Sequence, residues 1–238
     1  MKRFLFLLVS LCTFAACKVD STEVHMSGIS ADIRVVAEQS DQTDVTVYLQ
    51  RGDIDSLTYL DLKGNDKLFA TAAGMTEKEL SRSAFITISY DTRYSGITAA
   101  ATEFAVRFQR TIDRGAPRSA CTMPAAFDFS TPNAATQFSR ATQDIDVTYS
   151  PSGSGDQMRF KLTGSCINTV ERTIDTGDLG SFKIQKSLIT AQTDEQNKTC
   201  DVTLELERVK KGTLDSNFGK GGKIECLQRR TRAFKSAP

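Results

Sequence analysis

Histidine, the side chain that most often acts as a general acid or base, is nearly absent from this sequence. His25 is its single histidine and there is no tryptophan, so imidazole-based catalysis and histidine-ligated metal sites have almost nothing to be built from. Four pairs of acidic residues lack the alternating oxygen ligands and the closing glutamate of an EF-hand loop, so we interpret them as solvated turns and strand edges. They are Asp53/Asp55, Asp61/Asp66, Asp144/Asp146 and Asp175/Asp178. We expect no catalytic residue, no metal site and no cofactor.

Six cysteines are the other residues with chemistry of their own. Cys12 lies in an apolar leader and Cys17 follows that leader, which leaves Cys121, Cys166, Cys200 and Cys226. An even remainder in an exported chain indicates disulfides. No two of these cysteines have the Cys-x-x-Cys spacing, which disfavours a zinc ribbon or a thioredoxin-like redox motif.

Strand parity favours one of the three possible pairings. Cys166 continues the apolar alternation of residues 158–164, and Cys200 begins the alternation of residues 200–206. Side chains two apart share one face of a strand, so both cysteines are expected to face a core, as an inter-sheet bridge requires. We predict a Cys166–Cys200 bond, with Cys121–Cys226 closing the two ends of the same domain. Buried free thiols are the alternative.

The N-terminus has the features of an export signal. Lys2 and Arg3 precede the apolar run of residues 4–14, which is shorter than the ~20 residues of a membrane-spanning helix. We predict a signal peptide over residues 1–16; a buried core helix is the alternative.

The end of this segment resembles a known processing site. Phe14-Ala15-Ala16-Cys17 resembles the lipobox of bacterial lipoproteins, with small residues before Cys17 and with Phe14 where leucine is usual. The resemblance implies lipid attachment at Cys17. Because Lys18 follows where aspartate would favour the inner membrane, it also implies an outer-membrane anchor facing the periplasm. Residues 17–30 are then expected to form a polar tether. Ordinary cleavage after Ala16, which leaves Cys17 unmodified, is the alternative.

Period-two alternation of apolar residues dominates the rest of the chain and predicts strands with one buried face. The pattern occurs at 33–35, 45–49, 57–59, 86–90, 104–108, 145–149, 158–162, 182–184, 202–206 and 224–226. Short helical turns are expected only at 76–79 and after Thr131-Pro132. The segment 113–124 breaks the alternation with two prolines and a glycine. The sequence therefore predicts an all-β fold with two immunoglobulin-like β-sandwich domains in tandem, residues 31–115 and a disulfide-stapled 121–238.

Two short motifs have simple structural interpretations. Arg51-Gly52-Asp53 is an integrin-type tripeptide by sequence, but it is expected to be a turn that ends a strand. Residues 210–223 lack the spacing and the Ser/Thr of a P-loop, and we expect them to form a glycine-rich hairpin loop.

Charge is the last informative feature. The whole chain has a net charge of +1, which excludes a histone-like polycation, and we expect no nucleic-acid partner. Residues 208–238, however, hold nine basic and two acidic residues, and the chain without its leader has 28 basic and 29 acidic residues. The candidate binding residues in this basic segment are Lys220, Lys223, Arg229, Arg230 and Arg232. A solvated hairpin that protects an edge strand is the alternative.

The function expected from these observations is binding or scaffolding by an outer-membrane-anchored periplasmic lipoprotein. Its expected partners are the membrane, through the lipid, and an anionic envelope component or a protein. The alternatives are a carboxylate- or serine-dependent hydrolase of an envelope polymer, and a structural subunit that pairs strands through an open edge.

Overall fold

A computed structural model describes residues 17–84 and 87–238, and the described chain is all-β, as the alternation predicts. The predicted signal peptide, residues 1–16, lies outside the described residues. Helical structure among the described residues is limited to the single 3-10 turns η1 (Ser21–Glu23), η2 (Met26–Gly28) and η3 (Lys186–Leu188). No helix in residues 17–84 or 87–238 is both long and apolar enough to span a membrane.

The strands form three sheets. The largest has eleven strands, eight of them in the order β1-β4-β3-β2-β18-β17-β14-β15, while β7, β8 and β12 pair with it at the side. Its strands are β1 (Cys17–Asp20), β2 (Ile29–Ala37), β3 (Gln42–Arg51), β4 (Thr58–Asp61), β7 (Ser81–Ala84), β8 (Ile88–Ser95), β12 (Gln137–Ser139), β14 (Gln157–Gly164), β15 (Ile167–Ile174), β17 (Cys200–Lys211) and β18 (Gly222–Ala237).

The two smaller sheets have four and three strands, in the orders β10-β9-β5-β6 and β11-β13-β16. They contain β5 (Lys67–Ala72), β6 (Lys78–Glu79), β9 (Glu103–Gln109) and β10 (Ala116–Thr122), and β11 (Asp128–Thr131), β13 (Ile145–Ser150) and β16 (Ser181–Ile184).

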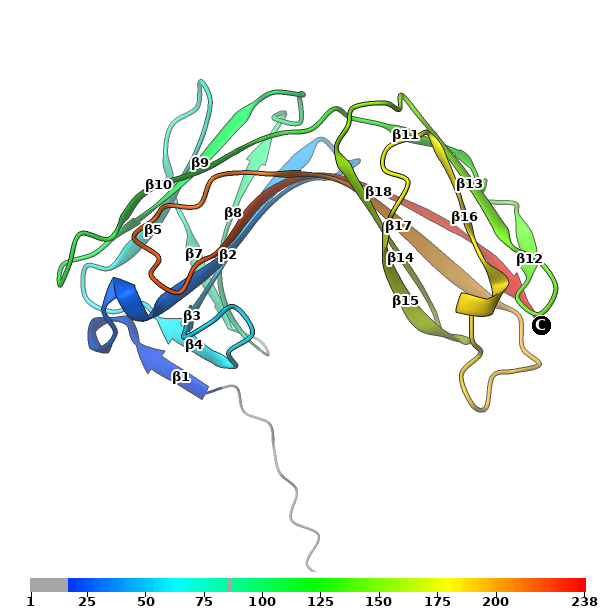
Figure 1. The fold of residues 1–238 in the computed structure, drawn as a ribbon, viewed down its shortest axis with the longest axis horizontal. Helices are drawn as coiled ribbons and strands as arrows, with labels where there is room; N and C mark the ends of the chain where they lie inside the picture. The colour runs from blue at the N-terminus through cyan, green and yellow to red at the C-terminus, as the bar shows by residue number, and fades with distance from the viewer. Residues whose placement is uncertain (1–16, 85–86) are drawn as a thin grey trace, which may run out of the picture.

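The molecule is an arch with two halves (Figure 1). The large sheet lines the inner side of the arch, and each small sheet packs on its outer side, one per half. The long antiparallel hairpin of β17 and β18 runs through both halves. β18 pairs with β17 over residues 225–236 and, in parallel, with β2 over residues 222–228. The loop between the two strands is the glycine-rich hairpin loop expected from the sequence.

Each half has its own hydrophobic core, so the fold is sandwich-like. The core of the first half is built from β2, β3, β5, β8 and β9, and it also includes Phe218, Ile224 and Cys226 from near the C-terminus. The core of the second half lies between β14, β17 and β18 on one side and β13 and β16 on the other. Residues of both predicted domain ranges, 31–115 and 121–238, therefore build the first core, because the last hairpin contributes to both halves.

A buried polar layer separates the two cores. The side chain of Arg208 is 1% exposed and forms an ion pair with Asp178 at 3.0 Å. It also donates hydrogen bonds to the carbonyls of Ala125 (2.8 Å) and Pro151 (2.6 Å). Gln228, on the neighbouring strand, donates to the carbonyl of Pro124. Because buried charges need partners, these residues fix the chain at the waist of the arch.

Both predicted disulfides are present, one in each half. Cys121–Cys226 joins β10 of a small sheet to β18 of the large sheet, with Cα atoms 5.7 Å apart, so it bridges the layers of the first half. Cys166–Cys200 has a Cα separation of 5.8 Å and lies within the large sheet, since Cys166 is in the turn between β14 and β15. The pairing is confirmed, but two expectations about its placement are wrong: the inter-sheet bridge is Cys121–Cys226 rather than Cys166–Cys200, and the two bonds lie in different halves rather than in one domain.

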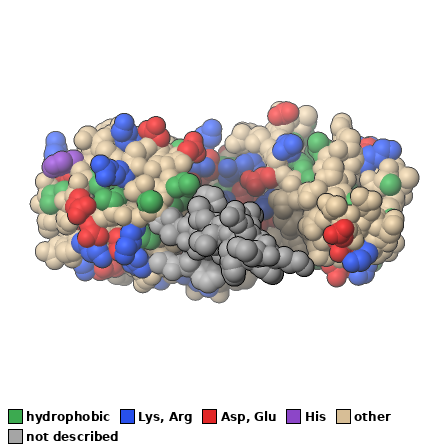
Figure 2. All heavy atoms as spheres, turned by 90° about the horizontal axis from the view of Figure 1, so that it is seen from below, with side chains coloured by type: hydrophobic (Ala, Val, Ile, Leu, Met, Phe, Trp, Pro, Cys, Tyr) green, Lys and Arg blue, Asp and Glu red, His purple; other side chains and the backbone are tan. Residues whose placement is uncertain are grey.

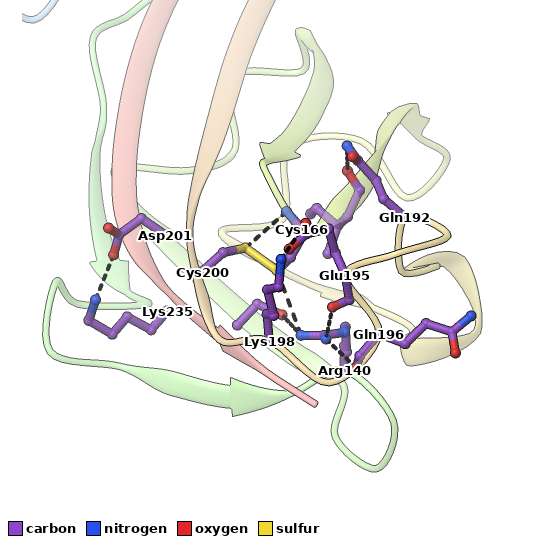
Figure 3. The surroundings of a disulfide bond; sticks show 11 residues. Arg140, Cys166, Gln192, Glu195, Gln196, Lys198, Cys200, Asp201 and Lys235 are labelled. Atoms are coloured by element: carbon purple, nitrogen blue, oxygen red, sulfur yellow. Dashed lines mark hydrogen bonds and ion pairs between the residues drawn. A yellow bond between two sulfur atoms is a disulfide. The ribbon is translucent and has the colours of Figure 1, made fainter.

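The loop before Cys200 is held by a buried arginine (Figure 3). Arg140 donates to the carbonyls of Glu195 (2.9 Å) and Gln196 (2.6 Å) and also lies 3.7 Å from the sulfur of Cys166. The disulfide and Arg140 thus fasten the loop of residues 190–199 to the end of the second half.

Residues 17–30 are part of the fold, which corrects the prediction of a polar tether. β1 pairs in parallel with β4, and Val24 and Met26 are buried in the first core. Arg110 donates to the carbonyl of Ser21 at 2.5 Å. Two apolar side chains and a buried arginine therefore hold this segment against the first half.

The helical turn predicted at 76–79 is wrong, because residues 78–79 form β6, which pairs with β5. A turn does follow Thr131-Pro132, closed by a hydrogen bond from Thr136 N–H to the carbonyl of Asn133, but it is not helical, and residues 137–139 form β12, which pairs with β18. Strand pairing outweighs the local capping signals here, as tertiary context commonly does. The alternation also predicted the wrong buried face around β4, since Leu60 is fully buried whereas Leu57 is 71% exposed.

Candidate binding surface

The inner face of the arch is a sheet face that carries charged residues. Along β2, β17 and β18, one set of alternate residues faces the cores and the other set faces the concavity. The inward-facing set on β17 and β18 includes Glu207 and Arg229, which are direct cross-strand partners. Arg159 on β14 lies opposite Glu207 on its other side. Figure 2 shows acidic and basic side chains gathered between the two halves on this face.

These charges form one network that extends over four adjacent strands. Arg229 contacts Glu207 (2.7 Å), Glu38 (3.1 Å) and Glu205 (3.4 Å). Glu207 also accepts from Arg34 of β2 at 3.0 Å and lies 3.3 Å from Arg159. Opposite charges on neighbouring strands therefore satisfy each other across the middle of the sheet.

Arg159 extends the network to a second group of charges. It contacts Glu225 at 3.1 Å, and Lys223 lies between Glu225 (3.7 Å) and Asp32 (3.8 Å). Two of the carboxylates are nearly inaccessible, since the side chains of Glu207 and Glu225 are 8% and 4% exposed. Charged residues are rarely buried to this extent unless they are paired, and both of these are.

The surroundings on this face favour the charged form of Arg229 and disfavour the charged forms of Asp32 and Glu38. Burial disfavours the charge of Arg229, but its hydrogen bond to Glu207 and the nearby carboxylates outweigh burial and raise its pKa. Burial raises the pKa of Asp32 and of Glu38 above their ordinary values, although the neighbouring cations oppose this. The carboxylates of Asp32 and Glu38 are thus more easily protonated than free carboxylates.

A small apolar cluster lies within the charged surface. Val36, Val209 and Leu227 are buried together on β2, β17 and β18, apart from the two main cores. Two buried polar atoms close by, Oδ1 of Asp32 and Nε of Arg159, have no hydrogen-bond partner among the described residues. These apolar side chains and unpartnered atoms are buried within the face, so a partner meets the mixed charges around them, which suits a partner that carries both signs.

The basic residues predicted to bind lie on different surfaces. Arg229 and Lys223 are on the concave face and are paired as described above. Arg230 and Arg232 point to the opposite face, where their guanidinium groups lie 5.7 and 5.5 Å from the rings of Phe127 and Phe129. Burial lowers the pKa of Arg230.

Lys220 lies elsewhere, in the hairpin loop. It lines a shallow pocket of the first half together with His25, Arg51 and Gly52. The structure brings Arg229 and Lys223 onto one face with Arg34 and Arg159, which sequence reasoning missed. The signal for these two was available in the parity of β2 and β14, but their acidic partners lie far away in the sequence.

The remaining candidate residues are exposed. Cys17 is a free thiol at the start of β1. The His25 side chain is 78% exposed, and its Nδ1 lies 4.0 Å from Asp113. Arg51 ends β3, and Gly52 follows with a φ of 92°, so the integrin-type tripeptide is a turn after a strand, as expected. No group of three or more potential metal ligands occurs in the described part of the chain.

Comparisons with known proteins find only distant structural similarity. No family model and no curated protein matches the chain. The fibronectin domains FN1–FN3 of chicken CNTN1 match with 7% identity and a TM-score of 0.29, covering 84% of this chain and 67% of that one. A calcium-binding domain pair of CALX1.1 matches with 9% identity and a TM-score of 0.24, covering 87% and 99%. A SusE-like protein matches with 10% identity and a TM-score of 0.25, covering 87% and 97%. These low scores assign no function.

Proposed function

We propose that this chain is a lipid-anchored protein of the bacterial cell envelope that binds a partner protein on the concave face of its arch. Its two halves are proposed to be immunoglobulin-like sandwiches fused through the β17–β18 hairpin. The proposal of an exported protein is supported by the leader, the lipobox-like residues and two disulfides, which persist in oxidising compartments.

The anchor would hold the first half close to the bilayer. Cys17 is exposed and is the first residue of β1, so a lipid on its sulfur would be separated from the folded domain by no flexible linker. Each buried methylene of an acyl chain contributes about 0.8 kcal/mol, so several chains would hold the domain firmly. Cys17→Ser should abolish palmitate labelling in cells; absence of labelling in the wild type would refute the lipid anchor.

The charged concave face is the observation that carries the binding proposal. Buried ion pairs are weak contributors to stability, because well-packed apolar residues of similar size are often as stable. Charge complementarity, in contrast, selects partners and orients them. A network of nine charged side chains on a sheet face that no described strand covers therefore fits recognition better than it fits stabilisation. These residues are Asp32, Arg34, Glu38, Arg159, Glu205, Glu207, Lys223, Glu225 and Arg229.

Site-specific photo-crosslinking in intact cells tests which face makes the contact. A photo-reactive residue at Thr46 of β3 would report from the concave side, and the matched control is Ala105 of β9, on the outer side. Both side chains are partly exposed. We expect a protein adduct from position 46 and none from position 105. Adducts only from position 105 would refute the concave face as the binding surface.

A further inference from the structure

The second half has an open side between its two sheets. β15 is the last strand of the large sheet, and β16 is the last strand of the small sheet of this half. A groove of about 490 Å³ lies between them and is lined by residues of both strands and of the connecting segment. The sandwich is thus not closed laterally at this point.

The groove has an apolar floor. Phe160 and Phe182, from opposite sheets, are stacked with ring centroids 5.4 Å apart. Ile174 and Leu188 also line the groove, and Leu179 at its end is 67% exposed. These apolar side chains line one groove together, unlike a single exposed leucine, which would need no explanation.

Both borders of the groove are strand edges. The outer edge of β15 is covered near its start, where Asn168 donates to the carbonyl of Thr190 and Ile167 bridges to Ala191. Residues 170–173 of β15 have no partner strand on that side among the described residues, and β16 pairs with β13 alone. An unpaired edge next to an apolar groove can accept an added strand, whose alternate side chains fill the groove.

A second copy of this chain is a poor occupant of this edge. In an antiparallel pair related by a two-fold axis, directly opposed residues have the same parity. Pairing centred on this segment would place Glu171 opposite its own copy or Arg172 opposite its own copy. Like charges directly opposed across strands are destabilising, so a strand from a different polypeptide is favoured.

The charges on the rim indicate the chemistry of that strand. Arg172 and Lys183 line the groove from its two borders, and Asp175 is the single acidic residue in the lining. The Lys183 ammonium lies 3.5 Å from a carboxylate oxygen of Asp146, and both side chains are more than half exposed. An acidic side chain on the incoming strand would complement this rim.

We propose that the groove between β15 and β16 binds an extended peptide segment of another protein as an added strand along β15. Apolar residues of the segment fill the groove over Phe160, Phe182 and Ile174, and an acidic residue lies against Arg172. This site is separate from the concave charged face, so either proposal can fail without the other.

Peptide display on the oxidised protein, residues 17–238, tests the proposal with a defined probe. A phage library of ten-residue peptides is panned, and the most enriched peptide is labelled and titrated by fluorescence anisotropy. We expect enriched sequences in which apolar residues alternate with polar ones and at least one acidic residue occurs. No enrichment, or enriched peptides without alternation, would overturn the proposal.

Two variants and one modified peptide identify the site and the binding mode. Arg172→Glu should weaken binding by about tenfold, the effect of losing roughly 1.4 kcal/mol. The control Lys211→Glu reverses an exposed charge at the far end of β17 and should leave affinity unchanged. Two peptides are methylated at alternate backbone amides, one at the odd and one at the even positions. Only one of the two should lose binding, because strand addition uses every second N–H group. Equal losses in both variants, or tolerance of both methylation patterns, would refute strand addition at β15.

Discussion

Removing each disulfide separately should cost different amounts of stability, because the two bonds close loops of different length. Cys121–Cys226 spans 105 residues and Cys166–Cys200 spans 34. In the chain-entropy model these loops correspond to about 4.8 and about 3.8 kcal/mol at 25 °C. The first bond also joins two sheets, whereas the second fastens a loop within one sheet.

The two bonds are nested, which changes the expected cost slightly. Cys166–Cys200 lies inside the longer loop and shortens the free chain that the outer bond closes. With the inner bond present, the outer bond closes about 71 free residues, and its contribution falls to about 4.4 kcal/mol. By the same model the inner bond, with the outer bond present, contributes about 3.4 kcal/mol, so the outer bond is expected to contribute more by roughly 1 kcal/mol.

Urea unfolding followed by far-UV circular dichroism measures this difference, since the chain has no tryptophan to report by fluorescence. The variants are Cys121→Ala with Cys226→Ala, and Cys166→Ala with Cys200→Ala. All four side chains are buried, so each pair loses comparable packing. A larger loss of unfolding free energy for the 166/200 pair would refute the loop-length reasoning. It would indicate that fastening of the loop of residues 190–199, together with Arg140, dominates.

Three further substitutions test the polar layer, the concave face and a close backbone approach. The hydrogen bonds from Ser154 and Arg208 outweigh burial and lower the pKa of Asp178 below its ordinary value of 3.8, so its contribution to stability is present above that pH and is lost as the pH falls through the lowered value. Asp178→Asn should lower the unfolding free energy at pH 7 by about 3–5 kcal/mol, because it leaves Arg208 buried without its counter-ion, and the difference from wild type should shrink in acid. The raised pKa of Asp32 has the opposite sign, since its ionisation disfavours the fold as the pH rises past 3.8, so Asp32→Asn should raise the urea midpoint at pH 7 and have little effect near pH 3. Gly212→Ala should destabilise, because a Cβ there would collide with the backbone of Ala120 and Cys121 in β10; an unchanged thermal midpoint would contradict that contact.

The strands that the sequence predicted are those in which one face is buried continuously. Residues 45–49, 104–108 and 158–162 alternate because every second side chain enters a core, and all three segments form strands. β15 was missed because a register irregularity opposite residues 162–164 interrupts its alternation. β10 was missed because its proline and small residues resemble a linker, although Cys121 and Ala116 are buried.

The candidate binding surface was harder to predict for a different reason. Counting residues 208–238 gives a strongly basic segment, but the charges of this segment alternate between two faces of the sheet. Glu207 lies opposite Arg229 only because β17 and β18 form a hairpin, and Arg34 reaches Glu207 only because β2 adds in parallel to β18. Net charge along the chain therefore overstates the positive charge that any one surface presents.

The shared hairpin also determines how the concave face can act. Two tandem domains joined by a linker would move relative to each other, and a surface formed between them would have to be ordered on binding. Here β2, β18, β17 and β14 are hydrogen-bonded neighbours in one sheet, and the charged network lies along them. Arg208 and Asp178 fix the outer layer at the same position along the arch. The arginines and glutamates are thus held in place before a partner arrives, so binding on this face should cost little conformational entropy.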